Sequence, residues 1–254
     1  MKTLLTTGFC LGATMIFAQT ALDLTTAETF SVPGEGSLLY RQHVTPDLPP
    51  DKKVPLILFL HGAGERGNDN AAQLKHGAAD LIKFGDANGG AIVIAPQCPA
   101  EEKWVDIPWD SLAHAMPAEP SASMKLVLAL VNEKIEKMPV DPDRIYVTGL
   151  SMGGYGTWDI IQRRPKLFAA ALPVCGGGDP ALAPAIKNIP VWIFHGADDD
   201  LVKVSRAHDM NAALKASGGN VQYREYPGVG HDSWTQTYAD QDVLKWLFEQ
   251  HRAK

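Results

Sequence analysis

Five apolar runs divide most of the chain, and each of them ends at a glycine or a polar residue. The runs cover residues 54–62, 91–97, 144–151, 168–178 and 190–196. A continuous run of this kind fits a strand that is buried on both faces, as parallel sheets require. An earlier segment (37–44) and an alternating segment (221–228) predict two further strands, the latter nearer an edge of the sheet.

Helical patterns lie between these runs. Residues 123–137 carry apolar side chains close to the 3.6-residue period, and 155–164, 205–216 and 238–251 are predicted as further helices. Strands that alternate with helices predict an α/β fold, a mostly parallel sheet with helices on both faces. The functional loops of such a sheet follow the carboxyl ends of its strands.

The first 18 residues have the pattern of an export signal. Lys2 precedes a short, interrupted apolar stretch, and Ala18 offers a cleavage point. A buried first helix and a membrane anchor are the alternatives. A signal peptide over 1–18 predicts a secreted or periplasmic mature protein, a single catalytic domain over 19–254, with no membrane attachment after the signal is removed.

Composition narrows the function classes. The chain has 254 residues, 45% of them hydrophobic, and a net charge of -6 at pH 7. Nothing in this balance favours nucleic acid or an anionic membrane surface as a partner.

Two cysteines, Cys98 and Cys175, remain after the signal is removed. They are expected either as two buried free thiols or as a disulfide, and their spacing does not indicate a metal site. The sequence gives no indication of the oligomeric state.

The stretch Gly149-Leu150-Ser151-Met152-Gly153 has the form G-x-S-x-G and lies between a predicted strand and a predicted helix. A sharp turn of this kind holds the serine in a strained conformation, and glycines on either side avoid a collision. We therefore predict that Ser151 is a nucleophile. A serine that only caps the helix is the alternative interpretation.

A serine nucleophile needs a histidine as base and a carboxylate that orients the histidine. In this kind of sheet the chain order is serine, acid, histidine. Of the eight histidines, His231 is the one that follows both the serine and the acidic turn on a loop after the last predicted strand. Asp199 is the preferred acid because it lies at the tip of its turn, and Asp198 and Asp200 remain as alternatives.

The loop after the run at 54–62 predicts an oxyanion hole. The amide of Met152 follows the nucleophile, and a second amide is expected from Ala63 or, failing that, from Gly64. The neighbouring Glu65 and Arg66 are predicted to form a structural ion pair under this loop, with contact to the substrate as the alternative.

Several segments together resemble the α/β-hydrolase superfamily. They are "PLILFLHGAGERGNDN", "APQCP", "VDPDRIYVTGLSMGGYGTW", "PVCGGGD", "VWIFHGADDDLVKV" and "GHDSW". Within it the chain is similar to secreted bacterial carboxylesterases of the polyhydroxybutyrate-depolymerase-like and feruloyl-esterase-like kind, a group that includes predicted peptidases. The resemblance implies the α/β-hydrolase fold, ester hydrolysis without a metal or organic cofactor, and Asp199 as the acid. Lys203 departs from it, since proline is common there.

The predicted function is therefore hydrolysis of short-chain, aryl or carbohydrate-linked carboxylic esters, with a small-molecule or polysaccharide-linked ester as partner. Segment 98–110 follows a strand at the active edge of the sheet and carries Trp104 and Trp109, and Trp234 lies three residues past His231. Their rings offer aromatic faces near the site. Trp104 and Trp234 are predicted to bind substrate, and core or rim packing is the alternative for these tryptophans. The short stretch 175–188 leaves no room for a large lid and disfavours long-chain lipids. A peptidase, an acyltransferase and a non-catalytic binding protein are the competing classes.

Overall fold

The computed structural model describes residues 19–253, and the predicted signal peptide lies outside them. Eight strands form one sheet in the order β1-β2-β4-β3-β5-β6-β7-β8. The strands are β1 (Thr26–Val32), β2 (Gly36–Val44), β3 (Val54–Leu60), β4 (Ile92–Gln97), β5 (Val140–Leu150), β6 (Ala170–Val174), β7 (Val191–Gly196) and β8 (Val221–Tyr226). β1 pairs with β2, and β2 with β4, in antiparallel fashion, and the remaining neighbours are parallel. The predicted fold class, an α/β-hydrolase fold, is confirmed.

Alternate side chains of the central strands point to opposite faces of the sheet. Leu56, Leu58 and Leu60 of β3 belong to one buried cluster, whereas Ile57 and Phe59 belong to a second. All of β3 is buried. A strand covered on both faces needs apolar side chains at every position, which explains why the sequence shows continuous runs there.

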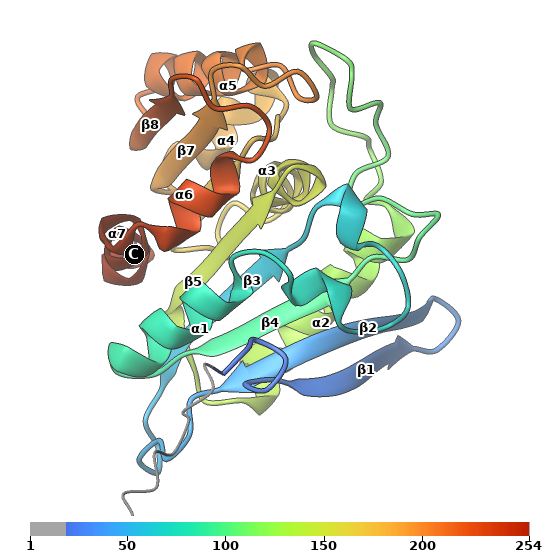
Figure 1. Cartoon of the computed structure of the whole chain (residues 1–254), viewed down its shortest axis with the longest axis vertical. Coiled ribbons are helices and arrows are strands. Elements are labelled where there is room, and N and C mark those ends of the chain that lie inside the picture. The colour runs from blue at the N-terminus through green and yellow to red at the C-terminus, as the bar shows by residue number, and fades with distance from the viewer. Residues whose placement is uncertain (1–18, 254) are drawn as a thin grey trace, which may run out of the picture.

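Helices cover both faces (Figure 1). The α-helices are α1 (Ala78–Ala87), α2 (Ala122–Lys137), α3 (Met152–Arg163), α4 (Ala183–Ile186), α5 (Ser205–Ala216), α6 (Ser233–Ala239) and α7 (Gln241–Glu249). Short 3-10 turns are η1 (Ala63–Glu65), η2 (Ala72–Leu74) and η3 (Pro180–Leu182). Side chains of α2, α3 and α5 belong to the first cluster, and those of α1, α6 and α7 to the second. No helix among residues 19–253 is long and apolar enough to cross a membrane.

Several elements differ from the sequence prediction. β1, α1 and α4 were not expected. The helix expected over 238–251 begins earlier, at Ser233, and is divided into α6 and α7. The division falls at Asp240, whose extended backbone ends α6 and whose side chain accepts a hydrogen bond from Asp242 N to cap α7. A capping aspartate starts a new helix in this way even inside a helical hydrophobic pattern.

Cys98 and Cys175 are both buried free thiols. Cys98 belongs to the first cluster and Cys175 to the second, so the sheet lies between them. This placement decides between the two states that the sequence left open, in favour of unpaired thiols.

Candidate active site

Ser151 occupies the sharp turn between β5 and α3. Its backbone has φ 53° and ψ -117°, a conformation that is costly for a residue with a side chain. A Cβ on Gly153 would lie 1.9 Å from the Leu60 carbonyl oxygen, and one on Gly149 would lie 2.4 Å from the Gly153 carbonyl oxygen. Only glycine therefore allows α3 to pack this closely against β3 and β5, which explains both glycines of the motif.

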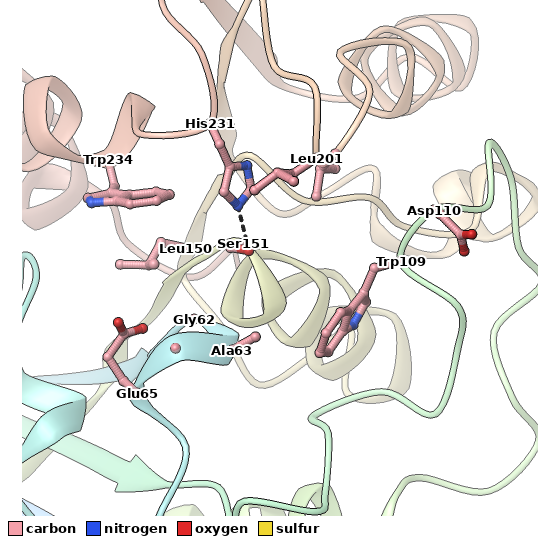
Figure 2. Close-up of a pocket in the computed structure, with 12 residues that line it drawn as sticks. Gly62, Ala63, Glu65, Trp109, Asp110, Leu150, Ser151, Leu201, His231 and Trp234 are labelled. Atoms are coloured by element: carbon pink, nitrogen blue, oxygen red, sulfur yellow. Dashed lines mark hydrogen bonds between the residues drawn. The ribbon is translucent and has the colours of Figure 1, made fainter.

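The structure brings Ser151, His231 and Asp199 together. The distance from Ser151 Oγ to His231 Nε2 is 2.8 Å (Figure 2), and that from His231 Nδ1 to Asp199 Oδ2 is 2.7 Å. His231 lies on the loop between β8 and α6, and Asp199 lies on the loop between β7 and α5. Both loops follow carboxyl ends of parallel strands, as the sequence predicted. This geometry lets an imidazole accept the proton of a serine hydroxyl while a carboxylate holds the opposite ring nitrogen.

Three hydrogen-bond donors hold Asp199 in place, and a fourth nitrogen lies close to it. Its Oδ1 accepts hydrogen bonds from the amides of Leu201 and Val202, both at 2.9 Å, and its Oδ2 also lies 3.2 Å from His195 Nε2. Burial would raise the pKa of Asp199, but the hydrogen bonds from His195, His231 and Val202 N outweigh burial and hold this pKa well below its usual range. The carboxylate is therefore ionised at neutral pH.

The two neighbouring acids have different surroundings. Asp198 and Asp200 are exposed, and Asp200 Oδ1 lies 3.4 Å from Lys203 Nζ at the surface. Asp199 has a relative exposure of 4%. Of the three candidates, Asp199 is thus the one whose carboxylate touches His231.

His195 is a contact that the sequence analysis missed. Its side chain is fully buried, and its Nε2 donates to the Val202 carbonyl oxygen at 2.8 Å. It therefore fixes the loop that carries Asp199 from the side opposite His231. The sequence signal was present, since His195 lies next to the last residue of β7 and only four positions before the acid.

The oxyanion loop lies directly beside Ser151. A Cβ on Gly62 would be 3.6 Å from Ser151 Cβ. Ala63 and Met152 are the first residues of η1 and α3, so their amides have no acceptor within their own helices. Two such amides next to the nucleophile can receive the negative charge of a tetrahedral intermediate. Gly64, the alternative donor, lies in the same turn.

His61 supports this loop from below. Its Nε2 accepts a hydrogen bond from Cys98 N at 2.9 Å, and its Nδ1 donates to the Gly62 carbonyl oxygen at 2.6 Å. An acceptor nitrogen must be unprotonated, so these two bonds require a neutral ring. Burial lowers the pKa of His61 from 6.5 to about 4.

We expect the free energy of unfolding to fall as the pH decreases from 6.5 towards 4, because the unfolded chain protonates His61 in this window and the folded chain does not. The contribution of His61 is at most about 3 kcal/mol. Urea unfolding at several pH values measures it. His61→Gln should flatten the slope by about one proton, leaving that of His114, whose pKa is also lowered to about 4. An unchanged slope in His61→Gln would contradict this account.

A cavity of about 510 Å³ opens above Ser151 (Figure 2). Its volume is in the range of small-molecule sites. The cavity is lined by Gly62, Ala63, Gly64, Glu65, Trp109, Asp110, Leu150, Ser151, Leu201, Val202, His231 and Trp234. Figure 2 shows Trp234, Leu150 and Glu65 on one side of Ser151, and Trp109 and Asp110 on the other.

The cavity corrects two predictions. Trp104 is fully buried and its Nε1 donates to the His61 carbonyl oxygen, so the expectation that it binds substrate is wrong. Trp109, five positions later, lines the cavity instead, and Trp234 lines it as expected. The expected Glu65–Arg66 pair is not among the ion pairs of residues 19–253. Arg66 donates to the Ala63 and Glu102 carbonyl oxygens, and Glu65 faces the cavity.

The segment between β4 and α2, whose tryptophans the sequence placed near the site, forms the second wall of the cavity. It carries Trp109 and Asp110 and rises beside α3 and α5 (Figure 1). Arg206 of α5 donates to the Leu112 carbonyl oxygen at 2.8 Å, and Asp179 accepts from Met116 N at 2.9 Å. Hydrogen bonds therefore connect this wall to the segments that follow β6 and β7.

Cys175, Asp199 and His231 form a cluster of potential metal ligands within the described part of the chain. The thiol is completely buried, and burial raises its pKa. His231 Nδ1 is already bonded to Asp199. Metal binding needs a thiolate and a free imidazole nitrogen, and both are disfavoured here.

The site combines four features: a serine on a sharp turn between strand and helix, an acid and a histidine on later loops, and free amides after an earlier strand. This combination defines the class of the α/β-hydrolases. Residues 47–247 match the phospholipase/carboxylesterase family. The chain belongs to this family, and its membership confirms the expected esterase class of hydrolases.

Relatives and solved structures agree with this assignment. A thermostable esterase of known structure is 40% identical, with a TM-score of 0.84 over 91% of this chain and 64% of its own. Feruloyl esterase B of Thermothelomyces thermophilus is 25% identical over 79% of this chain and 78% of its own length. An uncharacterized secreted protein of Arthroderma benhamiae is 27% identical over 91% of this chain, which spans 27% of that relative.

Proposed function

We propose that the protein hydrolyses carboxylic esters by a two-step acyl transfer with Ser151 as nucleophile, His231 as general base and Asp199 as the orienting acid. The observation that carries the proposal is the continuous chain of two hydrogen bonds, 2.8 Å and 2.7 Å long, that joins the three side chains. This chain ends at a cavity, so a substrate carbonyl can reach the hydroxyl.

In the first step Ser151 Oγ forms a bond to the ester carbonyl carbon while its proton passes to His231 Nε2. The amides of Met152 and Ala63 stabilise the oxyanion, and Asp199 stabilises the imidazolium. His231 then gives the proton to the leaving alkoxide, and the alcohol departs. In the second step water attacks the acyl-serine with His231 as base, which releases the acid and restores Ser151.

The substrate class follows from the walls of the cavity. Two tryptophan rings and two leucines give apolar walls close to Ser151. Such walls favour short-chain and aryl esters, or an ester linked to a sugar ring that stacks on an aromatic face. The similarity to a feruloyl esterase supports aryl and carbohydrate-linked esters among these.

We expect the purified protein to turn over p-nitrophenyl acetate and methyl ferulate but not peptide p-nitroanilides, because nothing lining the described cavity forms an extended peptide-binding edge. Covalent labelling by a fluorophosphonate probe, with Ser151→Ala as the unlabelled control, identifies the nucleophile. Preferential turnover of the anilides would support the alternative function, a peptidase acting on short peptides. Absence of labelling would overturn both.

The proposal includes export to the periplasm or the exterior. Its support is the sequence pattern of residues 1–18, a lysine followed by a short apolar stretch and a small residue.

A further inference from the structure

Glu65 has a buried carboxylate without a close partner. Its side chain is 8% exposed, and it lines the cavity. His76 is its ion-pair partner, with 3.6 Å between His76 Nε2 and Glu65 Oε1, which is longer than a hydrogen bond. Within residues 19–253 the carboxylate accepts no hydrogen bond. The acceptor positions of the carboxylate are therefore free, and a donor on a ligand in the cavity can occupy them.

The position of this carboxylate relative to the nucleophile is fixed by the oxyanion loop. Glu65 ends the η1 turn that begins at Ala63. A Cβ on Gly62 would lie 3.0 Å from Glu65 Oε2 and 3.6 Å from Ser151 Cβ. The carboxylate and the nucleophile therefore lie on either side of Gly62, next to Leu150 Cδ1, and all four residues line the cavity.

A flat aromatic surface faces the same space. The Trp234 ring lies 5.3 Å from the His231 ring and 5.4 Å from the His76 ring, between the proposed base and the partner of Glu65. Figure 2 shows this ring on the same side of Ser151 as Leu150 and Glu65. A substrate ring that packs against Trp234 would bring its substituents to the carboxylate.

We propose that Glu65 is a specificity-determining residue that accepts a hydrogen bond from a hydroxyl group on a substrate ring packed against Trp234. The inference rests on the proposed esterase function and names its substrate class, ring-hydroxylated esters. A carboxylate forms a strong, charge-assisted bond with such a hydroxyl, and it repels anionic substituents. The hydroxyl belongs either to an aromatic acyl group or to a sugar alcohol, and both present the same donor.

The experiment compares matched esters with and without the donor. One arm measures kcat/KM for methyl para-coumarate and methyl para-methoxycinnamate, and the other for acetylated glucose and its fully O-methylated analogue. The wild-type protein should prefer the hydroxylated member in one arm by roughly tenfold or more, because a site built for a hydroxyl rejects the analogue that lacks it. The arm that shows the preference identifies the source of the hydroxyl.

Substitution of Glu65 then tests the residue itself. Glu65→Leu should bring the ratio close to one, and Glu65→Gln, which keeps a neutral acceptor, should lower it partly. Asp110→Asn, which removes the carboxylate that lines the opposite side of the cavity, is the matched control, and its ratio should stay at the wild-type value. A merely structural role of Glu65 would lower both members of a pair equally and leave the ratio unchanged.

The inference is overturned if the wild type shows no preference in either arm, or if the preference survives in Glu65→Leu. Should Glu65→Leu fail to fold, as judged by circular dichroism, the isosteric Glu65→Gln decides. Hydrolysis of p-nitrophenyl acetate, which carries no ring hydroxyl, separates the two proposals. If this activity is present and depends on Ser151, a lost preference counts against Glu65 alone.

Discussion

Ser151→Ala is expected to lower kcat/KM for p-nitrophenyl acetate by roughly 10⁴-fold or more. The substitution removes the oxygen that lies 2.8 Å from His231 Nε2 and leaves no other nucleophile in its place. Alanine carries a Cβ as serine does, so the steric cost of the backbone conformation at this position, φ 53°, stays about the same. We therefore expect a folded but inactive protein.

Two measurements separate loss of chemistry from loss of structure in this variant. Thermal unfolding should give a Tm within a few degrees of the wild type, and binding of a product acid to the cavity should persist. Retention of most of the esterase activity by a folded Ser151→Ala protein would contradict the proposed mechanism.

Asp199→Asn is expected to lower kcat by about 10⁴-fold, with a smaller change in KM. The asparagine amide would offer a donor where His231 Nδ1 now finds an acceptor at 2.7 Å, so the imidazole would present the wrong nitrogen to Ser151. His195 Nε2 would keep its own acceptor, the Val202 carbonyl oxygen at 2.8 Å.

The neighbouring acids provide matched controls for this prediction. Asp198→Asn and Asp200→Asn make the same chemical change one residue away on the same loop, at exposed positions. Both should keep activity close to the wild type. If Asp199→Asn proves the mildest of the three substitutions, the assignment of the acid is wrong.

Much of the fold could be predicted because the central strands are buried on both faces. Continuous apolar runs located β3 to β7, whose residues pack against helices on either side. β1 is half-exposed at the edge of the sheet, and its polar residues hide it from a search for such runs. The residue before α1, Gly77, has a left-handed backbone conformation and provides no side-chain cap. The start of this helix therefore has no signal in the sequence.

The candidate site, too, could be predicted only in part from the sequence. The order of serine, acid and histidine along the chain follows from topology, and the structure brings these residues together. The direction in which a side chain of an irregular segment turns depends on contacts far away in the sequence. Trp104 and Trp109 lie in one such segment, and only the structure shows that the first is fully buried and that the second faces the cavity. Glu65 was expected to pair with Arg66 rather than to contact substrate, and only the structure shows that it faces the cavity.

The wall that carries Trp109 is fastened through its main chain. Two arginines donate hydrogen bonds to its carbonyl oxygens, Arg206 to Leu112 and Arg163 to Pro117 and Ala118. The Asp179 carboxylate accepts a hydrogen bond from the amide of Met116. Every residue type offers a backbone carbonyl, and every type except proline offers a backbone N–H, so point substitutions along this wall leave its anchors in place. Substrate preference can therefore diverge here during evolution while the framework stays constant. A library randomised at Trp109 is a direct way to redirect the enzyme.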